Sequence, residues 1–145
     1  MQLLSLFIVS IFMISHATAQ DYQVEMKNQG ELGYMVFEPS FLQLKLGDTV
    51  TFKAVDLGHN AQIIRFMKPR QAKAITGAIN EEITMKFDVN GFYGVKCQPH
   101  FTMGMVMLIK VGDSDSSELI IPPSLPKYVK KRFMEIAQQH SLPLP

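Results

Sequence analysis

Short apolar runs separated by turn residues follow one another from residue 21 to residue 111. In the run ITMKF, residues 83–87, apolar and polar side chains alternate, which is the period of a half-buried strand. The strand-like runs are DYQVEMK (21–27), YMVF (34–37), FLQLKL (41–46), TVTFKAV (49–55), EITMKFDV (82–89), FYGVK (92–96) and MVMLIKV (105–111). Many short strands with regular turn signals predict an all-β sandwich or small barrel.

Two segments depart from this rhythm. Residues 65–80, RFMKPRQAKAITGAIN, contain a proline and a glycine and predict a short helix or an irregular loop. Near the C-terminus, Val129, Phe133 and Ile136 recur at the spacing of one helix face, shortly after a proline-rich link. We therefore predict a β domain over residues 20–113 and a C-terminal helical extension over residues 114–145 that packs on the sandwich.

The N-terminus resembles a cleaved export signal. Residues 1–19 carry no charged side chain and consist of an apolar run followed by Ala17, Thr18 and Ala19, a pattern that signal peptidase cuts. A membrane anchor is the alternative, but the apolar run over residues 3–14 is shorter than the ~20 residues that span a bilayer. We expect cleavage between Ala19 and Gln20 and no membrane span in the mature chain.

Charge and cysteine content narrow the possible functions. The chain has 14 Lys and Arg against 13 Asp and Glu, a net charge of +1, which gives no reason to expect a nucleic-acid partner. Exported proteins often contain disulfides, but the single cysteine, Cys97, cannot form one within the chain. Cys97 is thus a buried inert thiol, an intermolecular crosslink, a nucleophile or a metal ligand.

The segment GVKCQPHFTMGM, residues 94–105, places Cys97, His100 and Met105 between two predicted strands. Thiolate, imidazole and thioether form a soft ligand set that copper prefers and that magnesium or calcium does not. His59, in the earlier turn DLGHNAQ, offers a fourth donor. Two histidines and a thiolate with a long axial methionine make the blue-copper electron-transfer site.

Each residue also has a structural explanation. His59 could be a hydrogen-bonded structural histidine, and the alternation of Met103, Met105 and Met107 could be the core face of a strand. A thiol nucleophile with His100 as its base is also conceivable, but the sequence offers no obvious orienting partner. The combination of donors in one turn of an exported β protein favours copper.

These motifs resemble those of the pseudoazurins, a group within the cupredoxin family of small blue copper proteins. The resemblance extends over essentially all of the predicted mature chain and includes the segments YMVFEPS, GDTVTF, GHN, AIN, FYGVKCQPHFTMGMV and the C-terminal helical tail. The resemblance implies a Greek-key β-sandwich or barrel of about eight strands. It also implies one type 1 copper ion, cycling between Cu(I) and Cu(II), with His59, Cys97, His100 and Met105 as ligands.

The resemblance extends to neighbouring residues. It implies that Asn60 ties the two ligand loops together near the thiolate, and that Pro99, Met35 and Met103 pack beside His100.

The implied function is that of a periplasmic one-electron carrier, a monomer that catalyses no reaction. Its expected partners are transient ones, a nitrite reductase and a c-type cytochrome. The alternative is a periplasmic copper-binding protein that hands the ion on. The ten methionines hint at this, but the eight in the mature chain are scattered across predicted strands. A copper enzyme would need substrate-accessible copper and more histidine ligands.

Overall fold

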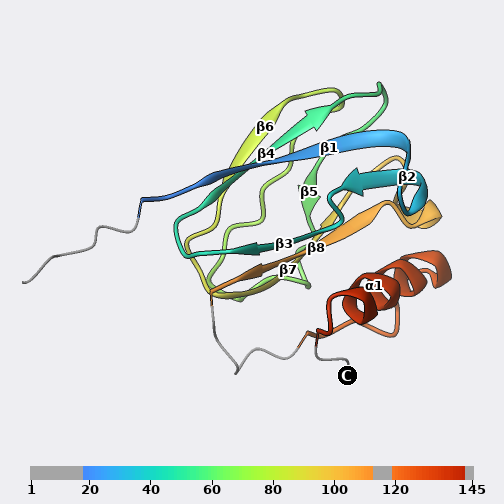
Figure 1. Ribbon diagram of the computed structural model, residues 1–145. Coiled ribbons are helices and arrows are strands. Elements are labelled where there is room, and N and C mark those ends of the chain that lie inside the picture. The colour runs from blue at the N-terminus through green and yellow to red at the C-terminus, as the bar shows by residue number, and fades with distance from the viewer. Residues whose placement is uncertain (1–17, 113–118, 143–145) are drawn as a thin grey trace, which may run out of the picture.

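Two four-stranded sheets pack face to face in the computed structural model, which describes residues 18–112 and 119–142. Most of the predicted signal peptide lies outside the described residues. One sheet has the order β2 (Gly33–Glu38), β1 (Asp21–Gly30), β4 (Thr49–Ala54), β6 (Ile83–Lys86). The other has the order β3 (Phe41–Leu44), β8 (Val106–Val111), β7 (Gly91–Lys96), β5 (Gln62–Ile63). Figure 1 shows the helix α1 (Lys127–Gln139) lying outside the second sheet.

The predicted β-sandwich with a C-terminal helix is confirmed. Strand β5 was not predicted, because it has only 2 residues and no visible alternation. The segment over residues 65–80 contains turns and no helix, and a single β-bridge joins its Thr76 to Gln62. Of the two structures predicted for this segment, the irregular loop is therefore the one observed.

Strand β8 is buried on both faces. Met107, Ile109 and Val111 belong to the core between the sheets, whereas Val106 and Leu108 belong to a second apolar cluster that includes the residues of α1. This double burial explains why MVMLIKV reads as an almost continuous apolar run instead of an alternating one.

Helix α1 extends the core through Val129, Phe133 and Ile136, all of which are fully buried. Its first turn also lies against the connection between β7 and β8, which contains the short 3-10 helix η1 (Phe101–Met103). A Cβ atom on Gly104 would lie 3.0 Å from the carbonyl oxygen of Tyr128. None of the helices in the described ranges is long and apolar enough to cross a membrane.

The topology brings two connections together at one end of the sandwich. Strands β7 and β8 are antiparallel neighbours, with Lys96 opposite Val106, so the connection between them starts and ends at this edge. Strand β5 pairs with β7 through Gln62 and Lys96, which draws the connection from β4 to β5 beside the end of β7. His59 lies in the second of these connections, and the other candidate ligands lie in the first.

Candidate metal centre

Backbone hydrogen bonds close the loop that carries three of the candidate ligands. The Cys97 N–H donates to the Met105 carbonyl over 3.0 Å, and the Met105 N–H donates to the His100 carbonyl over 3.2 Å. Gly104 completes the turn in the left-handed region, with φ of 90°. The loop thus holds these ligands in a fixed arrangement beside His59.

Three donor atoms form a compact triangle. The Cys97 Sγ lies 3.7 Å from His59 Nδ1 and 3.5 Å from His100 Nδ1, and the two Nδ1 atoms are 3.2 Å apart. The centre of such a triangle lies about 2 Å from each corner, close to the ~2.0–2.3 Å at which zinc, another first-row metal ion, binds imidazole nitrogen and thiolate sulfur. The three residues therefore fit a metal ion held in trigonal coordination.

Burial differs among the four candidate ligands. His59, Cys97 and Met105 are fully buried, whereas His100 is half-buried. The site therefore excludes solvent on most sides and approaches the surface at His100. A soft thiolate and thioether combined with two imidazoles is the donor chemistry of copper.

Burial shifts the pKa values of two ligands toward their neutral forms. Burial raises the pKa of the Cys97 thiol, although backbone N–H groups of Asn60 and His100 partly oppose the shift. Such a thiol is a poor nucleophile, and a bound cation is what stabilises its thiolate. Burial, and secondarily the charge of His100, lower the pKa of His59, while Asp56 opposes this. The neutral imidazole that binds metals is thereby favoured.

A residue that the sequence analysis missed orients His59. The Nε2 atom of His59 lies 3.0 Å from Asn28 Oδ1. Because an amide oxygen only accepts, Nε2 carries the proton and Nδ1 presents its lone pair to the donor triangle. No sequence signal pointed to Asn28, which precedes His59 by 31 residues and lies in strand β1.

Asn60 connects the segments around the two ligand loops. Its Oδ1 accepts from the Gln98 N–H over 2.7 Å, and its Nδ2 donates to the Gly77 carbonyl over 2.9 Å. Met103 is exposed and donates its backbone N–H to the His100 carbonyl over 3.1 Å. The packing of Pro99, Met35 and Met103 against the His100 ring stays a prediction.

The sequence and structure both match known copper proteins. The family model for copper binding proteins of the plastocyanin/azurin family matches residues 24–112. A pseudoazurin from Paracoccus pantotrophus is 39% identical over 122 residues, which cover 83% of this chain and 84% of that protein. This chain belongs to the pseudoazurins, within the plastocyanin/azurin family.

Solved pseudoazurin structures share its fold. The pseudoazurin from Methylobacterium extorquens AM1 superposes with a TM-score of 0.77 at 39% identity, covering 83% of this chain and 98% of that one. The pseudoazurin from Hyphomicrobium denitrificans gives a TM-score of 0.71 at 31% identity, with coverage of 82% and 97%.

Family and geometry together establish the nature of the site. His59, Cys97, His100 and Met105 form a type 1 copper site, as predicted. This pseudoazurin is a copper electron carrier and not an enzyme.

Proposed function

We propose that this protein carries one electron at a time between larger redox proteins of the periplasm, with a c-type cytochrome as donor and a nitrite reductase as acceptor. The observation that carries the proposal is the compact triangle of donor atoms from His59, Cys97 and His100. Copper, when bound, supplies a one-electron couple between Cu(II) and Cu(I).

The protein scaffold suits electron transfer because it restrains the ligands. Cys97 and Met105 are joined by a backbone hydrogen bond, and His59 is fixed by Asn28 at the far side of its ring. Buried side chains packed at the density of a crystal leave little room for the ligands to move. Restrained ligands keep the structural change between the two oxidation states small, so that transfer is fast in both directions.

His100 is the proposed route for the electron to the surface. It is the half-buried ligand of the four, and Leu57 and Met103, which are 76% and 52% exposed, belong to the two segments beside it. A Cβ atom added to Gly58 would lie 4.0 Å from His100 Cε1. The Leu57–Gly58 segment therefore lies against the His100 ring. Exposed apolar side chains beside the half-buried ligand suit a weak, short-lived encounter of a monomeric carrier with its partner.

The proposed location follows from the N-terminal sequence. Residues 1–19 would direct export and be removed between Ala19 and Gln20, leaving a copper domain over residues 20–113 and the helical extension over residues 114–145. N-terminal sequencing of the protein recovered from the periplasm tests this directly, because a chain that still begins at Met1 contradicts the proposed cleavage.

The visible spectrum of the mature protein with Cu(II) tests the proposed site and function. The wild-type protein should show an intense blue thiolate-to-copper band that disappears on reduction, and Cys97→Ser should lack it. A colourless wild-type complex with Cu(II) would refute the proposal. Repeated oxidation and reduction should leave copper bound, whereas loss of copper to a chelator during cycling would favour the alternative of a protein that hands copper on.

A further inference from the structure

We propose that Asp56 is a positioning residue for the copper ligand His59, and that it acts through Asn28. The inference rests on the electron-carrier function, and it assigns a role in setting the copper site to a side chain that binds no metal. Asp56 accepts a hydrogen bond from the Asn28 backbone N–H over 2.7 Å, and the Asn28 side chain in turn accepts from His59 Nε2 over 3.0 Å.

Regular strand pairing is interrupted at Asn28 on both sides of β1. In the hairpin of β1 and β2, Lys27 pairs with Val36 and Gln29 pairs with Tyr34, but the ladder skips Asn28. The residue that would face it, Met35, has φ of 52° and has left the extended conformation. A backbone N–H without a ladder partner requires another acceptor or water.

On its other side, Asn28 lies past the end of the parallel ladder between β1 and β4. The last pair in that ladder joins Met26 to Ala54, and the Asp56 N–H then donates to the Met26 carbonyl over 3.2 Å. Asp56 thus stands two residues beyond the ladder, level with Asn28. Its carboxylate takes the place of the missing ladder acceptor, and its strong charge-assisted bond fixes the backbone from which the Asn28 side chain reaches His59.

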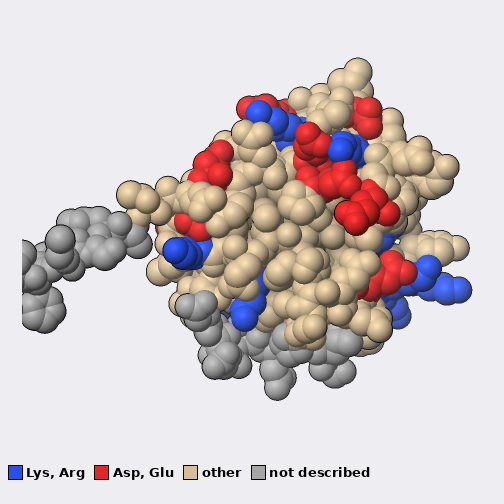
Figure 2. Space-filling model, in the orientation of Figure 1, with Lys and Arg blue, Asp and Glu red and all other residues tan. Residues whose placement is uncertain are grey.

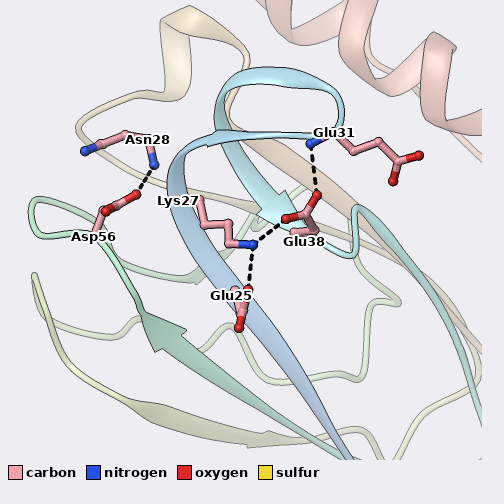
Figure 3. Close-up of polar contacts among 6 residues, drawn as sticks. All are labelled: Glu25, Lys27, Asn28, Glu31, Glu38 and Asp56. Atoms are coloured by element: carbon pink, nitrogen blue, oxygen red, sulfur yellow. Dashed lines mark hydrogen bonds and ion pairs between the residues drawn. The ribbon is translucent and has the colours of Figure 1, made fainter.

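An ion-pair network holds the same hairpin next to Asn28. The Lys27 ammonium lies 2.7 Å from a Glu25 oxygen and 2.6 Å from a Glu38 oxygen, and Glu38 also accepts from the Glu31 N–H over 2.9 Å. Figure 3 shows these contacts on the hairpin and the separate contact of Asp56 with Asn28. Figure 2 shows a cluster of acidic side chains over the region of β1 and β2, with further acidic side chains elsewhere on this face. The network restrains the strands, but only Asp56 bonds Asn28 itself among these side chains.

Two substitutions at Asp56 distinguish the effect of its hydrogen bond to Asn28 from the effect of its negative charge. Asp56→Asn removes the negative charge and keeps an oxygen that can accept from Asn28, whereas Asp56→Ala removes both. We expect Asp56→Ala to weaken Cu(II) binding about 10-fold to 100-fold, the usual effect of losing a group that orients a metal ligand. The copper hyperfine splitting in its EPR spectrum should change as well. Asp56→Asn should keep the wild-type affinity within about twofold and the wild-type EPR spectrum, with a reduction potential raised as much as in Asp56→Ala.

A matched control and a double variant complete the test. Glu82→Ala removes an exposed acidic side chain that has no bond to Asn28, and it should leave affinity and EPR spectrum unchanged. If Asp56 acts through Asn28, Asp56→Ala should have no further effect on copper affinity in an Asn28→Ala background.

Two results would overturn the proposal. One is equal copper affinity and equal EPR spectra for Asp56→Ala and Asp56→Asn, which would leave a role for charge alone. The other is an Asp56→Ala protein that unfolds more easily yet binds copper as the wild type does, which would make Asp56 a purely structural residue. Neither result bears on the electron-carrier function, which is tested separately by the blue band of the wild-type protein and by its retention of copper through redox cycles.

Discussion

The contact between helix α1 and the ligand loop predicts that Gly104→Ala disturbs the copper site from the outside. Gly104 has φ of 90°, a conformation that costs a residue with a Cβ about 1–2 kcal/mol. The added Cβ would also lie 3.0 Å from the Tyr128 carbonyl oxygen, closer than ordinary contact. Because that neighbour is backbone in the first turn of α1, either the helix or the loop must move.

The expected destabilisation of Gly104→Ala is the sum of the backbone strain and the steric overlap. Overpacking of a well-packed contact costs about 1–3 kcal/mol, so the total destabilisation should be about 2–5 kcal/mol. Gly47→Ala is a matched control, since Gly47 has φ of 92° and nothing within 4 Å of an added Cβ. That variant should lose only the strain, about 1–2 kcal/mol.

Urea unfolding of the copper-free proteins and visible spectra of the Cu(II) forms measure the two effects. Gly104→Ala should unfold at lower urea than Gly47→Ala, and it alone should shift the blue band, because its loop carries His100 and Met105. If the two variants unfold alike and both keep the wild-type spectrum, the reasoning that α1 presses on the ligand loop is wrong.

Three further predictions concern the ligands and the helix. Met105→Leu should retain copper and raise the reduction potential, because an electron-donating sulfur that favours Cu(II) is lost; unchanged voltammetry contradicts this. Phe133→Ala should cost about 3–5 kcal/mol in urea unfolding, since Phe133 is fully buried between α1 and the sheet; a cost below 1 kcal/mol would mean that the helix is not part of the core. Copper-free protein should lose stability as the pH falls below about 6.5, because the lowered pKa of His59 means that the unfolded state binds the proton first; denaturation midpoints that do not depend on pH between 5 and 8 contradict this.

Sequence patterns predicted the ligand loop well because three of the ligands lie close together in the sequence. Cys97, His100 and Met105 lie within nine residues, and a strand on either side fixes where the loop begins and ends. His59 could be proposed because few histidines were available, with 4 in the whole chain. The pairing of β5 with β7 that brings His59 to the loop could not be predicted, since β5 has only 2 residues.

The groups that support the ligands were harder to predict. Asn28 reads as an ordinary turn residue after a strand, and its role depends on where the pairing of β1 with β4 ends in the folded sheet. The contact of Gly104 with Tyr128 joins segments whose sequences show only a turn and a helix start. Such contacts depend on register and docking between elements, which periodicity does not encode.

Two elements that carry no ligand therefore reach the copper site by separate routes. Strand β1 acts on His59 through the Asn28 side chain, whereas α1 acts on the loop of His100 and Met105 through Gly104. Substitutions at sites that share no partner usually have additive effects. The combined variant Asn28→Ala/Gly104→Ala should thus lose copper affinity by the product of the two separate losses, measured by competition with a Cu(II) chelator. A combined loss no larger than the greater single one would show that both routes act on one shared distortion of the site.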